Sequence, residues 1–183
     1  CNDLKNILSR VINCVSNNNP RPEINGILFN FVDNKLMLAG TDGYRLSEGI
    51  ISINNENNTN EQVILPLFTA QEINKILQIQ DGNIDLYTSD TQVLFVFENI
   101  KLISRVISGN YPDYKQIIPE NFKTEFNIIK SDFLSIVKNV GLFADKNIND
   151  IKILIKNNKV TVESKNNELG ENIVEIETEV KGE

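Results

Sequence analysis

Apolar and polar positions follow two periods along this chain, one typical of helices and one typical of strands. Residues 3–16 carry an apolar stripe at helical spacing, made of Leu4, Ile7, Leu8, Val11, Ile12 and Val15. This spacing predicts an amphipathic α-helix that buries one face. Pro20 and Pro22 then end the helical pattern, because proline disfavours helix in the residue before it.

Alternating apolar segments after this helix predict antiparallel strands joined by short turns. The predicted strands are Ile24–Phe31, Leu36–Ala39, Ser47–Ile53, Val63–Leu65, Ile84–Thr88, Val93–Phe97 and Ile100–Val106. A second helix is predicted to begin near Thr69, which would serve as its N-cap with Glu72 completing a capping box.

The pattern of helix followed by hairpin occurs twice, at an offset of 124 residues. Asn34 and Lys35 in the first hairpin correspond to Asn158 and Lys159 in the second. From Phe122 the chain restarts with the predicted strand Glu125–Ile128, a helix capped by Ser131, a hairpin over 151–163 and the strand Ile173–Val180. We therefore expect an α+β fold of tandem domains, each with two helices packed on antiparallel sheets. The expected domains are residues 1–122 and an incomplete second copy over residues 123–183.

Composition restricts the classes of function. The net charge of −7 argues against a simple basic nucleic-acid binder, although the two signs of charge can be segregated between surfaces. No apolar stretch approaches the ~20 residues of a membrane span, and no signal peptide opens the chain. Cys1 and Cys14 are interpreted as reduced thiols of a cytoplasmic protein. An N-terminal cysteine in place of methionine leads us to expect a piece of a longer protein.

The sequence lacks the residues that most catalytic mechanisms require. The chain has no histidine, and it carries no cysteine cluster for zinc and no glycine-rich phosphate loop. Asp42 and Asp113 are the only acids within distinctive motifs, and each stands beside a turn-forming residue. Turn capping is the favoured role for both, so we predict a protein without catalytic residues, metal or cofactor. A metal-dependent nuclease remains the alternative from a different class.

Three stretches together resemble a known family. They are Ile24-Asn25-Gly26-Ile27-Leu28-Phe29, Ala39-Gly40-Thr41-Asp42-Gly43-Tyr44-Arg45-Leu46 and Gly109-Asn110-Tyr111-Pro112-Asp113-Tyr114. Their order and spacing resemble the middle domain of the bacterial sliding clamp, the β subunit of DNA polymerase III. Residues 123–183 would then be the first half of the third clamp domain.

The resemblance implies a processivity factor that encircles duplex DNA as a homodimeric ring when full length. Helices of each domain would line the hole, where positive charge can contact the DNA backbone without reading its sequence. The expected DNA-facing residues are Arg10, Arg21, Lys138 and Lys146. Such a protein is expected in the cytoplasm, associated with the nucleoid.

The resemblance also implies a hydrophobic groove for short peptides from the replicative polymerase, the clamp loader and repair proteins. The matching positions are Ile24, Thr41, Gly43, Tyr44, Arg45, Leu46, Pro112 and Ile117. A plain protein-interaction module that never meets DNA is the other alternative to a clamp.

Overall fold

A computed structural model describes residues 1–55, 60–145 and 150–182. The chain divides into two compact units, Cys1–Tyr114 and Lys115–Glu183. The division predicted from the sequence falls after residue 122, eight residues further along the chain.

The first unit contains a four-stranded antiparallel sheet in the order β3-β2-β1-β4. Its strands are β1 (Gly26–Val32), β2 (Lys35–Thr41), β3 (Leu46–Ser52) and β4 (Glu61–Pro66). The four predicted strands are confirmed, except that the first begins later than expected. Ile24 lies in a short 3₁₀ helix, η2 (Pro22–Asn25), where Pro22 suits the first turn of a helix because it has no N–H to leave unpaired.

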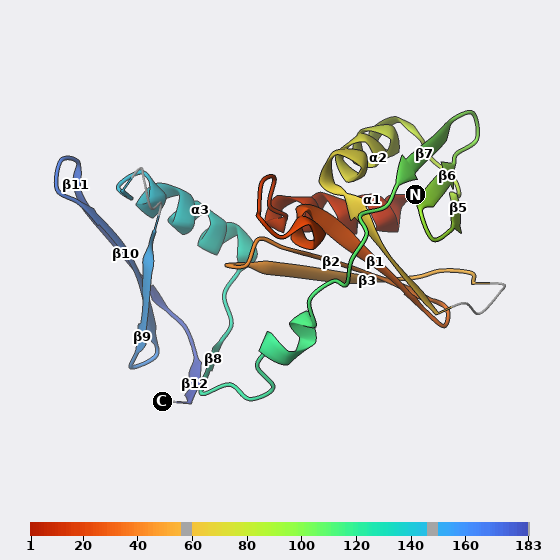
Figure 1. Ribbon diagram of the computed structural model, residues 1–183. Helices are drawn as coiled ribbons and strands as arrows, with labels where there is room; N and C mark the ends of the chain where they lie inside the picture. The colour runs from red at the N-terminus through yellow and green to blue at the C-terminus, as the bar shows by residue number, and fades with distance from the viewer. Residues whose placement is uncertain (56–59, 146–149, 183) are drawn as a thin grey trace. The chain divides into compact units, whose positions relative to one another are not determined.

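Two helices lie on the same side of this sheet, as Figure 1 shows. They are α1 (Asn2–Val11) and α2 (Leu67–Ile79), which contact each other. The apolar stripe predicted for α1 is buried, with Leu8 and Val11 fully inaccessible. The helix is shorter than predicted because its last turn tightens into a 3₁₀ helix, η1 (Ile12–Cys14), before Val15 becomes extended.

The predicted capping box at Thr69 is wrong. Helix α2 begins at Leu67, directly after β4, and has no side-chain cap at its N-terminus. Leu67 is buried in the core. Its apolar packing therefore favours a helix that begins nearer the N-terminus than the capping pattern predicts. The Thr69 hydroxyl instead lies 2.8 Å from the hydroxyl of Ser104.

A second sheet completes the core of the first unit. It contains β5 (Asp85–Thr88), β6 (Gln92–Val96) and β7 (Lys101–Arg105), in the order β5-β6-β7. Phe95 of β6 meets Phe29 of β1 edge to face, with ring centroids 6.2 Å apart, and both side chains are almost fully buried. One hydrophobic core therefore joins both helices and both sheets of this unit.

The second unit repeats the helix and hairpin. Helix α3 (Lys130–Gly141) packs on a three-stranded sheet of order β11-β10-β9, formed by β9 (Lys152–Lys156), β10 (Lys159–Asn166) and β11 (Gly170–Glu177). The short strands β8 (Thr124–Phe126) and β12 (Val180–Gly182) pair with each other. Ser131 does not cap α3 as predicted, because the helix already begins at Lys130 and the Ser131 hydroxyl bonds to Asp132.

The internal repeat is confirmed in hydrogen-bonding detail. The N–H of Ile53 donates to the carbonyl of Asn34 at 2.9 Å, and the N–H of Thr178 donates to the carbonyl of Asn158 at 3.0 Å. Thus each hairpin turn is held in the same way by the chain that follows the third strand. Asp33, Asn157 and Asn158 all have positive φ in these turns, a conformation that Asn and Asp tolerate better than other non-glycine residues.

Candidate functional site

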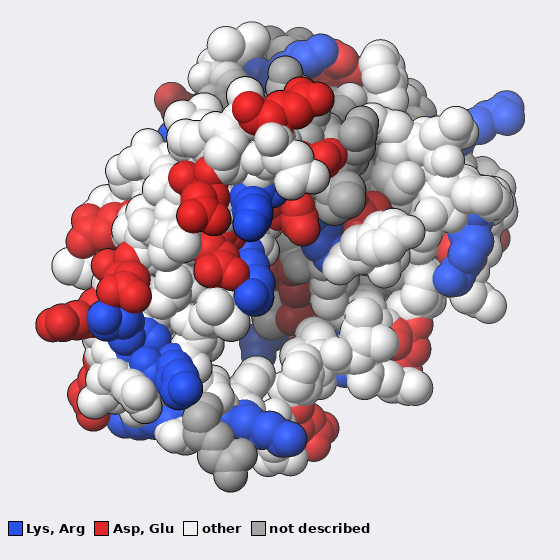
Figure 2. Space-filling model, turned by 90° about the vertical axis from the view of Figure 1, so that its left-hand side faces the viewer, with Lys and Arg blue, Asp and Glu red and all other residues white. Residues whose placement is uncertain are grey.

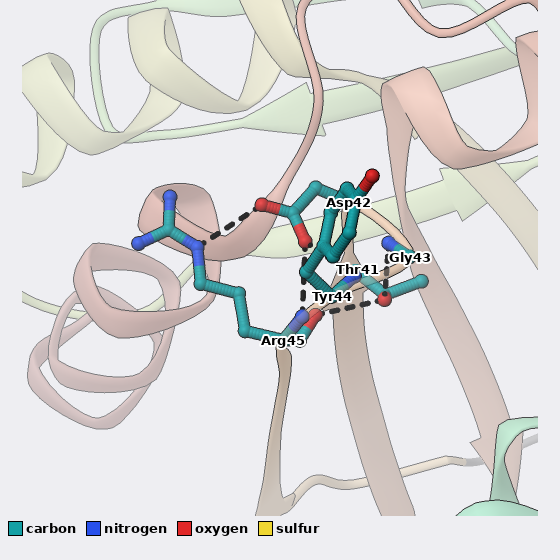
Figure 3. A network of polar contacts seen from close by, with 5 residues as sticks. All are labelled: Thr41, Asp42, Gly43, Tyr44 and Arg45. Atoms are coloured by element: carbon teal, nitrogen blue, oxygen red, sulfur yellow. Dashed lines mark hydrogen bonds and ion pairs between the residues drawn. The ribbon is translucent and has the colours of Figure 1, made fainter. Parts of the chain in front are cut away.

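The β2–β3 turn is built by a local network of hydrogen bonds (Figure 3). The Asp42 carboxylate accepts from the backbone N–H groups of Tyr44 and Arg45, at 2.9 and 3.0 Å. The Thr41 hydroxyl donates to the carbonyl of Arg45 at 2.8 Å and accepts from the N–H of Gly43 at 3.1 Å. Both polar side chains therefore satisfy backbone groups of the turn, and the predicted capping role of Asp42 is confirmed.

Gly43 occupies the one position of this turn that needs a left-handed backbone, with φ of +93°. A Cβ at this position would meet nothing within 4 Å, so glycine is favoured here by conformation and not by space.

The charge of Asp42 is held in place by its neighbours. Partial burial acts to raise the pKa of this carboxyl, but the two backbone hydrogen bonds and the Arg45 guanidinium outweigh it and lower the pKa below its ordinary value. The Arg45 Nε lies 3.1 Å from Asp42 Oδ2. At neutral pH the turn therefore carries an ionised carboxylate that is already engaged within the turn.

The turn presents an aromatic ring and a guanidinium to the surroundings. Tyr44 is 100% exposed, and the Arg45 side chain is also largely exposed. Leu46, the first residue of β3, is half-buried. A fully exposed aromatic residue beside arginine is a combination enriched at the energetically dominant positions of protein interfaces.

Leu46 connects the turn to a small apolar cluster on the sheet face that the helices do not cover. The cluster, here called the outer cluster, contains buried Leu28, Ala39, Ile64 and Tyr114, with Leu46, Ile107 and Tyr111 partly buried against it. Tyr111 and Tyr114 meet edge to face, with centroids 6.3 Å apart. Half-buried Pro112 lies between these tyrosines in sequence, so the outer cluster brings the segments around residues 41–46 and 107–114 together.

A cleft of about 400 Å³ lies beside the outer cluster, along the edge of β4. Its lining includes apolar Ile64 and Ile107 together with Glu61 and Asp90. This cleft is not predicted by the pattern of residues in the sequence. The N–H of Ile107 donates to the carbonyl of Ile64 at 2.8 Å, which fixes one side of it.

The two remaining predicted groove residues, Ile24 and Ile117, differ in exposure to solvent. Ile24 is buried, at 3% exposure, so it offers little open surface. It stands beside Glu23, and a Cβ on Gly109 would lie 3.8 Å from the Glu23 Cβ, which places η2 next to the 107–114 segment. Ile117 is 69% exposed in η3 (Tyr114–Ile117), on the second of the two compact units.

Sequence reasoning missed two residues of this region, Glu48 and Tyr114. The Tyr114 hydroxyl donates to the Glu48 carboxylate across 66 positions of sequence. The available signal was an acid at an alternating position of β3 between Leu46 and Ile50, where an apolar residue would continue the pattern.

The predicted DNA-facing residues have different charge environments. Arg10 is exposed in the last turn of α1, and Lys138 is exposed in the last turn of α3. Arg21 is exposed but forms an ion pair with Glu23 at 2.9 Å, so part of its charge is compensated. Lys146 lies outside the described residues.

Charges of both signs are mixed over the face that Figure 2 shows, where Lys and Arg lie among Asp and Glu. The sheet of the second unit contains cross-strand ion pairs, including Lys152 with Glu163 at 2.8 Å and Lys159 with Glu175 at 2.7 Å. Within residues 1–55, 60–145 and 150–182, no three Asp, Glu or Cys side chains gather as metal ligands would. No helix in the described parts of the chain combines the length and apolar character needed to cross a membrane.

Comparisons of the sequence and of the structure with known proteins indicate the same family. The family model of the DNA polymerase III beta subunit, central domain, matches residues 1–113. A beta sliding clamp from Staphylococcus epidermidis is 34% identical over 168 residues, which is 91% of this chain and 44% of that protein. The chain thus spans about half the length of the curated relatives it matches.

Solved structures agree in fold. The DNA polymerase sliding clamp from Bacillus subtilis superposes with a TM-score of 0.91 at 27% identity, covering 98% of this chain and 48% of that one. A sliding clamp from Bartonella birtlesii bound to griselimycin superposes with a TM-score of 0.90 at 25% identity, covering 100% of this chain and 50% of that one.

Proposed function

Because this chain belongs to the DNA polymerase III beta subunit family, we propose that its protein is a sliding clamp. In this proposal it encircles duplex DNA as a homodimeric ring when full length, without catalysis or cofactor of its own. It tethers the replicative polymerase, the clamp loader and repair proteins to DNA in the cytoplasm, at the nucleoid.

The observation that carries this proposal is the common placement of α1 and α2 on one side of the four-stranded sheet. A ring needs helices on its inner side and sheet on its outer side, and this arrangement meets that need within one unit. The exposed positions of α1 include Asn6, Ser9, Arg10 and Asn13, a polar surface that DNA could pass without being gripped at particular bases.

The two compact units fit the same proposal. We assign residues 1–122 to the middle domain of the clamp and residues 123–183 to the following domain. The repeated helix, hairpin and closing hydrogen bond support a common origin of the two units.

We propose further that the surface around the β2–β3 turn binds peptides. Thr41, Gly43, Tyr44, Arg45, Leu46 and Pro112 would form one wall of the groove, and Ile24 and Ile117 are the further positions that the sequence predicts for it. Exposed Tyr44 and Arg45 would frame the rim, and the outer cluster would support the apolar floor near Leu46.

Retention on DNA tests the ring directly. The full-length protein is loaded by its clamp loader onto nicked circular DNA and then followed by gel filtration in high salt. A clamp remains on the circle and is released when the circle is cut by a restriction enzyme, because its hold is topological. Release from the intact circle, or magnesium-dependent cleavage of the DNA by the protein, would contradict the proposal.

A further inference from the structure

Glu48 stands at the end of a row of side chains that crosses the whole four-stranded sheet. In the strand register it lies opposite Ala39, which lies opposite Leu28, which in turn lies opposite Ile64. The other three members of the row are buried residues of the outer cluster. Glu48 is therefore a charged residue at the β3 edge of an otherwise apolar row.

Tyr114 connects this carboxylate to the segment that covers the sheet. Its ring is buried, at 5% exposure, within the outer cluster, and its hydroxyl donates to Glu48 Oε2. A hydroxyl that bonds to an ionised carboxylate makes a stronger hydrogen bond than a neutral pair does. Without Glu48, this hydroxyl would lose the one acceptor that the structure gives it among the described residues.

The 107–114 segment is thus held at both edges of the sheet. At the β4 edge, the N–H of Ile107 donates to the carbonyl of Ile64 at 2.8 Å. At the β3 edge, the Tyr114 hydroxyl donates to Glu48. Pro112 lies between these two attachments, and η3 begins at the second of them.

The protonation state of the Tyr114 hydroxyl allows it to donate a hydrogen bond at all physiological pH values. Burial raises its pKa, and the hydrogen bond to Glu48 and the charge of that carboxylate raise it further. The phenol therefore keeps its proton throughout the physiological pH range.

We propose that Glu48 is a positioning residue of the peptide groove: by holding the Tyr114 hydroxyl, it sets the place of Pro112 and the start of η3 relative to Leu46. This inference rests on the proposed groove. Glu48 itself need not touch the peptide, and its effect on binding passes through Tyr114.

The test measures griselimycin binding to the full-length protein by titration calorimetry. Griselimycin is the compound bound in the Bartonella birtlesii clamp structure. Glu48→Ala and Tyr114→Phe are each expected to weaken binding by roughly 5- to 30-fold, the range that corresponds to one lost hydrogen bond to a charged group. The double variant should bind no more weakly than either single variant, because both changes remove the same bond.

Two further variants separate positioning from general stability. Glu48→Gln keeps an oxygen that can accept the hydroxyl, so it should restore binding to within about threefold of wild type. Glu72→Ala is the control, since Glu72 also makes a local side-chain contact, with Lys75 at 2.6 Å, but lies on α2 and lines neither the proposed groove nor the cleft. Its binding should equal that of wild type.

The outcomes distinguish this inference from the groove proposal. If wild type binds griselimycin and both Glu48→Ala and Tyr114→Phe bind it equally well, positioning by Glu48 is wrong and the groove stands. Equal weakening by Glu48→Gln and Glu48→Ala would also overturn the inference, because the acceptor would then not be what matters. If wild type does not bind, the groove proposal fails and the inference fails with it. Should Glu48→Ala not fold, Tyr114→Phe, which removes a single oxygen, decides the question.

Discussion

Asp42 and Arg45 are joined twice within one turn, once through the backbone and once through their side chains. The carboxylate of Asp42 accepts the backbone N–H of Arg45 at 3.0 Å, its second oxygen lies 3.1 Å from the Arg45 guanidinium, and the first oxygen also accepts the N–H of Tyr44. The exposed ion pair alone contributes little. The backbone bonds fix the direction in which Tyr44 and Arg45 leave the sheet, and this direction matters for a binding surface.

The stability contributed by Asp42 is expected to depend on pH. Because its folded pKa is lowered, its contribution is present above about pH 4, the ordinary range of Asp, and is lost as the pH falls through the folded pKa. Asp42→Asn should therefore be less stable than wild type at pH 7, by about 1 kcal/mol, and the difference should shrink toward pH 2–3. Urea unfolding of both proteins across this pH range measures it. A constant difference would show that the charge is not involved.

Arg45→Ala should weaken griselimycin binding by the full-length protein by roughly 1–3 kcal/mol, the usual loss at a dominant interface position. The Arg45 side chain is exposed, so the substitution should leave the free energy of unfolding almost unchanged. Leu46→Asp should weaken binding at least as much, because it places a charge against the outer cluster. Titration calorimetry gives both values.

Arg105→Ala serves as the control for these two variants. It removes an exposed arginine from β7, in the other sheet of the same unit. If Arg105→Ala weakened binding as much as Arg45→Ala, the effect would be one of net charge and not of the groove.

Gly43→Ala and Gly141→Ala should change stability in opposite directions. Neither added Cβ would meet an atom within 4 Å, but Gly43 has φ of +93° whereas Gly141 lies in α3. An L-residue at a left-handed position costs roughly 1–2 kcal/mol, whereas alanine in a helix gains about 0.4–1 kcal/mol. Urea midpoints of the two variants provide the comparison, and equal shifts would refute the conformational explanation.

Arg10→Ala and Lys138→Ala should each weaken non-specific duplex binding by the full-length protein. Each loss of a phosphate contact is expected to reduce the slope of log K against log salt by about one. Fluorescence anisotropy with a labelled duplex at several low salt concentrations measures this slope. Lys165→Ala, on β10, is the control and should leave the slope unchanged. An unchanged slope for Arg10→Ala would remove α1 from the DNA-facing surface.

Part of this structure could be predicted because it depends on neighbours in sequence. The apolar stripe of α1, the alternating strands and the turn chemistry at Asp33, Asp42 and Gly43 follow from local conformational preferences. The 124-residue repeat was visible for the same reason, since both copies use the same local pattern. Element boundaries were less predictable, because core packing of Leu67 outweighed the capping preference of Thr69.

The sequence by itself determined the helices, the hairpins, the repeat and the turn that displays Tyr44 and Arg45, since each arises from residues a few positions apart. Only the tertiary structure decided that Tyr114 meets Glu48, 66 residues away, and that Ile24 is buried. The physical reason is that strand register and the packing of a covering segment bring together residues that are distant in sequence. Neither can be inferred from the spacing of residues that are close in sequence.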